Sequence, residues 1–382
     1  MALRGLNGCA RIVLTDASRA AVLRGALLQS DCLKCHCGGR RHLLSEDVVK
    51  LQDFQQRKLA VAHQVSGSKD RHRYYFDTVN QKMEKNELIL KDELKQLHLC
   101  QSAEDVMMAR NAIYRYHNEN RNMAFGEFRF GPLFMRLCYE LGLEELAATT
   151  LTDPALKRFF SDSTSFNIAI DMLFTKGCYE NVLEVVGEMK KQGVLFNKDT
   201  FTLAFATCYE LNTSESYHIC LALLEGQTKG SLIPRHAYCF AIALALKQNN
   251  VERAQTIYSQ IMSTDSWLCQ NLKVLILAMT GSMKDAISAL TTALVSKTPV
   301  LVKKPKEVVN VLRQKSTNAL WEGRVEQVVR RLEEAGQITK QTLDDFLCHT
   351  PSGKRRLLGI IEQEIKSSRR TLRPLQSTLL SE

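Results

Sequence analysis

The 382-residue sequence is 45% hydrophobic and 24% charged, carries a formal charge of +10, and contains only 7 prolines and 19 glycines. This is the composition of a globular protein with a large core, and it excludes a low-complexity chain. Apolar runs such as 239–246 are far shorter than the roughly 18 residues that a membrane-spanning helix needs, so we expect no membrane span. Most of the 12 cysteines are scattered singly, which indicates a reducing compartment rather than a disulfide framework.

Residues 1–42 have the composition of a mitochondrial presequence, with seven Lys or Arg against two acidic residues. Their apolar residues lie in short groups between the arginines, whereas a secretory signal has one continuous apolar block. We therefore predict a transit peptide over 1–42, processing near Arg40 and Arg41, and a location in the mitochondrial matrix. Removal of these seven positive and two negative charges leaves a formal charge of +5. Such a modestly basic chain permits a phosphate-bearing partner without requiring one.

The same segment contains thiols and imidazoles of the kind that ligate zinc, namely Cys32, Cys35, Cys37, His36 and His42. No second Cys-x-x-Cys or His pair completes the set at finger spacing, and processing would remove the cluster. We interpret it as incidental and predict neither a metal nor another cofactor.

The region 43–127 is predicted to be a helical N-terminal region, which an eroded repeat pair would also explain. Ser102 and Asp105 resemble a capping box that opens a helix through Tyr116.

One pattern recurs about every 35 residues over 128–301. Apolar residues lie at helical spacing between Ser163 and Gly177, and again from 179 to 191 before Gly193. Glycine is a common residue just after a helix, and Gly142 lies 35 residues before Gly177. Neither helix can bury its apolar stripe alone, so the pairs must stack on one another. We predict five units, at about 128–162, 163–197, 198–234, 235–266 and 267–301.

The unit 163–197 resembles the pentatricopeptide repeat. It matches that family's pattern in Phe166-Asn167 near its start, in Gly177 at the end of the first helix, and in the Glu-Met-Lys-Lys-Gln-Gly run at 188–193. The other units are degenerate, and the resemblance covers under half of the chain. It implies an all-α fold, a helix-turn-helix repeat solenoid wound as a right-handed α-superhelix, here with helical flanking regions.

The resemblance also implies single-stranded RNA in a groove along the first helices, with one base per repeat read by two or three side chains. The principal readers in 163–197 would be Asn167 and Asn197, whose amides offer a donor and an acceptor to a base. Thr164 lies where family members sandwich the base, and an Asn–Asn pair suits a pyrimidine. The structural alternative for Asn167 is helix capping, which asparagine does well.

The positions that correspond to Asn167 in the other units are less uniform. Thr202 and Asn271 retain polar side chains and are predicted to bind RNA, whereas Cys239 is a thiol and Pro132 has no side-chain hydrogen bond to offer. Five degenerate repeats read at most five bases. We therefore expect the flanking helices or protein partners to contribute further specificity.

Residues 302–382 are predicted to form a helical C-terminal region with a basic tail. The stretch 354–373 contains seven Lys or Arg against two Glu. Such a run is either a solvated face or an additional RNA contact, and the sequence leaves both readings open.

Motifs for catalysis are missing from the sequence, including the deaminase signature, the Gly-rich phosphate loop and the close aspartate set of a metal nuclease. We therefore predict a non-enzymatic mitochondrial protein that binds single-stranded mitochondrial RNA, together with protein partners, and supports the processing, maturation or stability of transcripts and thereby respiratory-chain function. The first alternative is a protein-binding scaffold of the tetratricopeptide type, whose period is 34. The second, an enzyme with an unrecognised site, is disfavoured by the missing motifs. A basic, amide-lined groove would favour RNA, and carboxylate clamps or apolar pockets would favour a peptide.

Overall fold

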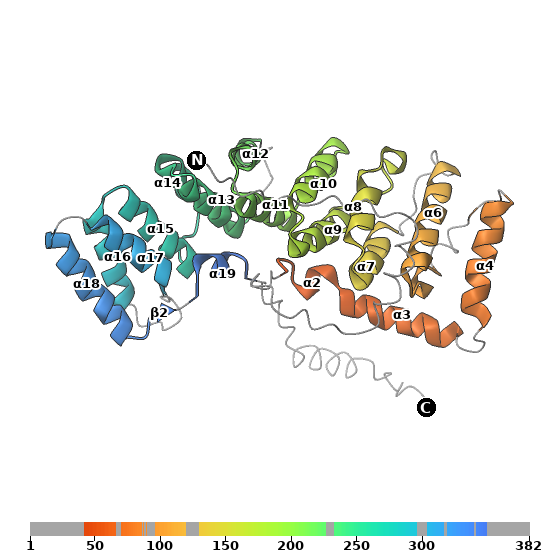
Figure 1. The fold of residues 1–382 in the computed structure, drawn as a ribbon, viewed down its shortest axis with the longest axis horizontal. Helices are drawn as coiled ribbons and strands as arrows, with labels where there is room; N and C mark the ends of the chain where they lie inside the picture. The colour runs from red at the N-terminus through yellow and green to blue at the C-terminus, as the bar shows by residue number, and fades with distance from the viewer. Residues whose placement is uncertain are drawn as a thin grey trace, which may run out of the picture. The chain divides into compact units, whose positions relative to one another are not determined.

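Helical pairs stacked along the chain make up the structure, a computed structural model (Figure 1). It describes residues 42–65, 70–85, 87, 89, 96–119, 130–226, 233–295, 304–316, 319–339 and 341–349. The predicted all-α repeat solenoid is confirmed. Within these residues, the β-structure consists of two strands of two residues each, β1 (Lys304–Pro305) and β2 (Ile338–Thr339), which pair in parallel. The predicted presequence other than His42, and the basic tail, lie outside the described residues.

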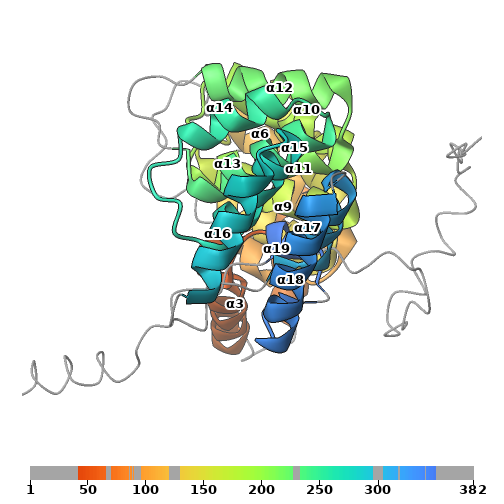
Figure 2. The same cartoon turned by 90° about the vertical axis from the view of Figure 1, so that its left-hand side faces the viewer.

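Five helical pairs form the repeat region. They are α7 (Gly131–Leu141) with α8 (Glu144–Thr152), α9 (Ser163–Lys176) with α10 (Tyr179–Lys191), α11 (Lys198–Leu211) with α12 (Ser214–Glu225), α13 (Arg235–Lys247) with α14 (Val251–Ser259), and α15 (Trp267–Met279) with α16 (Met283–Val295). Each first helix packs against the first helix of the next pair. Figures 1 and 2 show α10, α12 and α14 along one side of the stack. We call the opposite side, formed by α7, α9, α11, α13 and α15, the first-helix face.

A residue in the left-handed conformation follows the first helix of every pair. These residues are Gly142, Gly177, Asn212, Asn249 and Gly281, with φ between 47° and 81°. Glycine adopts this conformation without a steric penalty, and asparagine is the side-chain-bearing residue that tolerates it best. Asn249 therefore substitutes for the glycine of the repeat pattern without loss of the turn.

The core of the stack is dominated by aromatic side chains of the first helices. Phe134, Phe166, Phe205 and Phe240 are fully buried, one on each of four successive first helices. Truncation of such a ring to alanine costs about 3–5 kcal/mol. Gly131 allows α7 to approach α9 closely, because a Cβ at this position would lie 2.5 Å from Oγ of Ser165.

Helical segments precede and follow the pairs. Before them lie α2 (Glu46–Val49), α3 (Leu51–Val65), α4 (Asp70–Glu84), the 3₁₀ turn η1 (Gln96–Leu99) and α6 (Ala103–Glu119); η2 (Pro154–Leu156) lies between α8 and α9, and α17 (Lys306–Lys315), α18 (Ala319–Glu334) and α19 (Leu343–Leu347) come last. The predicted cap of α6 is confirmed, since Oγ of Ser102 accepts from N–H of Asp105 at 3.1 Å and Oδ2 of Asp105 accepts from N–H of Ser102 at 2.9 Å. No helix among the described residues has the length and apolarity to cross a membrane.

Three of the flanking helices lie on the first-helix face. Helix α2 packs on α9, α3 on α7, and α19 on α13. Figure 1 shows all three on the side of the stack away from α10, α12 and α14. Segments from both ends of the described chain therefore cover the face that contains the residues predicted to bind RNA.

Candidate nucleic-acid interface

Asn167 and Asn197 meet where α9 packs against α11. Nδ2 of Asn167 donates to Oδ1 of Asn197 at 3.0 Å, and Oγ1 of Thr200 donates to Oδ1 of Asn167 at 2.7 Å. Asn197 is the N-cap of α11, and its Oδ1 also accepts from N–H of Thr200 at 2.9 Å. The exposed fraction of Asn167 is 1%. The residue that caps a helix is thus Asn197, and Asn167 supports this cap from α9.

The same contact recurs between α13 and α15 with different chemistry. Cys239 is the fifth residue of α13, as Asn167 is of α9, and Cys269 is the third residue of α15, as Thr200 is of α11. The Sγ atoms of Cys239 and Cys269 lie 3.7 Å apart. The hydrogen bond between the two thiols lowers the pKa of Cys269 and raises the pKa of Cys239. This position therefore joins α9 to α11 and α13 to α15, although the side chains differ.

A cavity of about 280 Å³ beside α7 has three cationic side chains in its lining, together with apolar residues, a histidine and one carboxylate. Lys50 comes from the turn between α2 and α3, Arg57 from α3 and Arg136 from α7, whereas Asp53 is the one acidic side chain in the lining. Within the described chain, neither Lys50 nor Arg57 forms an ion pair. The wall also contains Pro132, the first-unit counterpart of Asn167.

The geometry around Arg136 places a partly buried positive charge in the cavity wall. Its Nε donates to the carbonyl oxygen of Val49 at 2.6 Å, so a neutral acceptor holds the guanidinium in place. Burial lowers the pKa of Arg136, and the nearby charge of Arg57 lowers it further. In the opposite direction, three carboxylates are near enough to raise this pKa, those of Asp162, Asp53 and Glu46. A partly buried cation beside a second cation is stabilised by an anion in the space between them.

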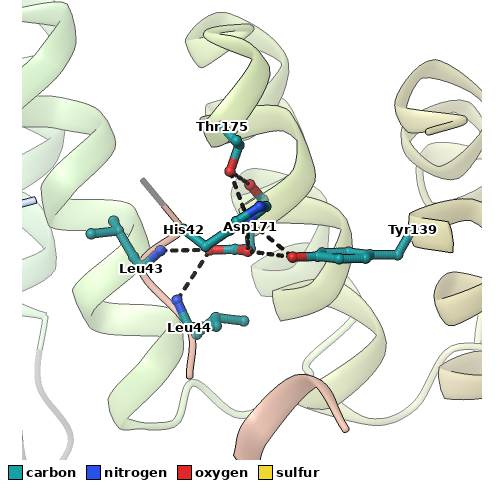
Figure 3. Close-up of polar contacts among 6 residues, drawn as sticks. All are labelled: His42, Leu43, Leu44, Tyr139, Asp171 and Thr175. Carbon is teal, nitrogen blue, oxygen red and sulfur yellow. Dashed lines mark hydrogen bonds and ion pairs between the residues drawn. The ribbon is translucent and has the colours of Figure 1, made fainter. Parts of the chain in front are cut away.

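A second polar cluster, around Asp171 of α9, was not anticipated from the sequence (Figure 3). Asp171 is fully buried, and its Oδ1 accepts from the backbone N–H groups of Leu43 at 2.9 Å and Leu44 at 3.2 Å. Its Oδ2 lies 2.8 Å from Nδ1 of His42. A buried carboxylate with three such partners anchors the segment 42–44 to α9.

The hydroxyl groups around His42 all approach one ring nitrogen. The oxygens of Tyr139 and Thr175 lie 2.9 and 3.0 Å from Nδ1, the atom that also contacts Asp171. The hydrogen bond to Asp171 raises the pKa of His42 against the opposing effect of burial. These three oxygens surround Nδ1 and hold the His42 ring beside the buried Asp171 carboxylate, so the cluster is a structural anchor for the segment 42–44.

Comparison with known proteins gives full-length matches. The chain is 67% identical to pentatricopeptide repeat-containing protein 2, mitochondrial, of Danio rerio and 47% identical to that of Xenopus laevis, with both chains of each pair covered completely. It is 45% identical to the Homo sapiens protein, over 92% of each chain. The chain belongs to the pentatricopeptide repeat-containing protein 2 family. No protein-family model matches it, which is consistent with the degenerate repeats. The names of these relatives agree with the resemblance seen in unit 163–197 and with the mitochondrial presequence.

The structure brings together only some of the residues predicted to bind RNA in this pentatricopeptide protein. Asn167 and Asn197 are in contact, and Thr164 is half-buried near the start of α9. Thr202 is half-buried, and its Oγ1 donates to the carbonyl of Lys198 in its own helix at 3.0 Å. Asn271 is fully buried, with Nδ2 donating to the carbonyl of Trp267 at 2.9 Å. The amides of this pentatricopeptide protein thus already have partners inside the stack.

The cationic cavity could not be predicted from the sequence, because its charged side chains come from separate parts of the chain. Lys50 and Arg57 precede the repeats, and Arg136 lies among apolar residues of α7. No periodic signal links them. Among the described residues, no group of three or more His, Cys, Asp or Glu side chains is arranged to hold a metal ion.

Proposed function

We propose that this pentatricopeptide protein binds single-stranded mitochondrial RNA in the matrix and supports the processing, maturation or stability of transcripts without catalysing a reaction itself. The observation that carries the proposal is the cation-lined cavity at the first unit. Lys50, Arg57 and Arg136 surround it beside Pro132, at the start of the row of positions that contains Asn167. Phosphate oxygens are the natural ligands of such a cluster, and repeats of this family bind RNA along the same row.

In this arrangement, different residues would contact the phosphates and the bases of the RNA. The cations would hold the backbone independently of sequence, and partly exposed side chains such as Thr164 would contact bases. Because Asn167 is buried, its contribution to base readout requires a rotation of its amide or an opening of the joint with Asn197. Specificity for one transcript would then depend on partners, as the small number of repeats also suggests.

The contacts of the segment 42–44 indicate where the predicted presequence is cleaved. The anchor between Asp171 and residues 42–44 makes His42 part of the fold. We therefore propose that processing occurs before His42, after Arg40 or Arg41.

Ultraviolet crosslinking in isolated mitochondria tests the proposal. The full-length protein, expressed and imported, should be recovered covalently attached to single-stranded RNA, and less of it should be recovered as salt is raised during washing before crosslinking. Recovery of the protein without RNA at low salt would contradict the proposal.

A second candidate function, a protein-binding scaffold, is favoured by one observation. The chain's own segment 341–349 already binds the first-helix face through a carboxylate, an aromatic ring and a backbone carbonyl. This face therefore has groups that suit a peptide. Stable recovery of a protein partner on this face, without crosslinked RNA, would favour the scaffold.

A further inference from the structure

The chain reverses direction after α18 instead of continuing the stack. α18 packs on α16, near the C-terminal end of the described fold, yet α19 packs on α13, within the repeat region. Figure 1 shows α19 on the first-helix face beneath α11 and α13. We call residues 341–349 the C-terminal segment. A helix that caps a solenoid covers its last repeat, and this one lies across earlier repeats.

Polar contacts attach the start of the C-terminal segment to α11 and α13. The hydroxyl of Tyr209 donates to Oδ1 of Asp344, and Nζ of Lys247 lies 3.6 Å from the same oxygen. The ammonium of Lys247 also lies 3.6 Å from the centre of the Tyr209 ring. At the other end, Sγ of Cys348 donates to Oε1 of Glu210 at 3.3 Å.

The middle of the segment contacts the first turns of α13 and α15. Nε2 of His236 donates to the carbonyl oxygen of Leu347 at 2.7 Å. The ring of Phe346 meets Trp267 edge to face, with centroids 4.1 Å apart. These are the groups that offer stacking and hydrogen bonds to any ligand on this part of the face.

The fourth unit, 235–266, shows what the segment covers. Its second, fifth and last residues are His236, Cys239 and Ser266, which correspond to Thr164, Asn167 and Asn197 of the unit 163–197. All three line one cavity of about 290 Å³, together with Leu268, the second residue of the next unit. Phe346 of the C-terminal segment lines the same cavity.

We propose that the C-terminal segment is an internal competitor that occupies the first-helix face at α11, α13 and α15 and must leave before RNA binds there. The proposal rests on the proposed RNA-binding function and adds its regulation. Phe346 and the RNA would need the same space beside His236, and Asp344 would repel phosphates that approach Lys247. The segment would cover α11, α13 and α15, and the cationic cavity at α7 would stay accessible.

The contact between Asp344 and Lys247 is suited to reversible release, whereas Leu347 of the same segment is fully buried and becomes exposed when the segment leaves. The Asp344 side chain is 56% exposed and its partner Lys247 is 38% exposed, so water replaces their interaction readily. In contrast, the segment 42–44 is anchored by the fully buried Asp171. An RNA ligand would therefore displace the C-terminal segment in preference to the N-terminal one.

The thiol of Cys348 reports on release of the segment in the full-length protein. Its alkylation rate is measured by mass spectrometry with and without saturating single-stranded RNA, and half-buried Cys178, distant in sequence on the turn before α10, is the internal reference. RNA should raise the rate at Cys348 by roughly tenfold and leave Cys178 unchanged. Phe346→Ala and the size-conserving Asp344→Asn should raise the rate at Cys348 without RNA and lower the Kd for RNA by roughly three- to tenfold. The matched control is Gln341→Ala, an exposed position of the same segment.

The outcomes separate this proposal from the proposed function. RNA that binds without changing alkylation of Cys348, and with the same Kd in both variants, overturns the competition and leaves RNA binding intact. Failure of the wild type and of both variants to bind RNA, although Cys348 is alkylated rapidly in Phe346→Ala, overturns the RNA-binding function and the competition with it. Release of the segment by a captured protein but not by RNA also overturns the competition with RNA.

Discussion

The Sγ atoms of Cys239 and Cys269 lie 3.7 Å apart at the joint that Asn167 and Thr200 form between earlier units. The spacing in sequence is 30 residues for the thiol pair and 33 for the amide–hydroxyl pair. The two spacings differ because the fourth unit, 235–266, is shorter than the second unit, 163–197. Within the helices, the two pairs of residues occupy the same positions. The fifth residue of α9 and of α13 therefore serves packing between first helices, in addition to any role with RNA.

This joint predicts a stability cost for the two asparagines. Asn197→Ala removes the N-cap of α11 and should lower the free energy of unfolding by about 1 kcal/mol. Asn167→Ala removes two hydrogen bonds, while the Thr200 hydroxyl and the Asn197 amide keep their bond to each other, and should cost about 1–3 kcal/mol. Because the residues are in contact, the double variant should cost less than the sum. Urea unfolding followed by circular dichroism measures these values. Thr202→Ala, which loses a bond within its own helix, is the control.

Substitution of Asp171 should lower the free energy of unfolding more than substitution of Asn197. Asp171→Ala removes the acceptor of two backbone N–H groups and of His42, and should lower the free energy of unfolding by about 2–3 kcal/mol. Hydrogen exchange at Leu43 and Leu44 should also become faster, since these amides lose their partner. Glu184→Ala, an exposed acidic position on α10, should change neither quantity. Unaltered exchange at Leu43 in Asp171→Ala would show that the segment is held by other contacts.

The same cluster predicts a dependence on pH. The hydrogen bond to Asp171 raises the pKa of His42 above 6.5 in the folded state. The folded protein therefore binds this proton more tightly than the unfolded chain does. The resulting stability is fully present below pH 6.5 and is lost as the pH rises through the raised pKa. His42→Ala should accordingly destabilise more at about pH 5.5 than at about pH 8.5, measured by urea unfolding. The exposed His218→Ala serves as the control, and an equal cost of His42→Ala at both pH values would rule out the protonated anchor.

Local patterns were sufficient to predict the repeats. Gly177 and Gly193 end helices as expected, because a left-handed residue leaves a signature in the sequence. The segments 42–44 and 341–349 gave no such signal, since their contacts with Asp171 and His236 span more than 100 residues. Periodicity identifies which face of a helix is covered, but it does not identify which distant segment covers it. The burial of Asn167 was missed for the same reason, because its partners lie 30 and 33 residues away, at the cap and in the first turn of α11.

The cationic cavity predicts the salt dependence of RNA binding. Each phosphate contact with single-stranded RNA contributes about 0.7 to the slope of log K against log salt concentration. Lys50→Gln and Arg57→Gln should each reduce the slope by about that amount, with equal loss of affinity for all sequences, because phosphates carry no base identity. The control is Lys284→Gln, which removes an exposed cation of α16 that does not line the cavity. Fluorescence anisotropy with two unrelated oligonucleotides at several salt concentrations gives the slopes. If the Lys284 variant lowered the slope as much as the other two, the attraction would be that of the net charge alone, and this cavity would not be an RNA-binding site.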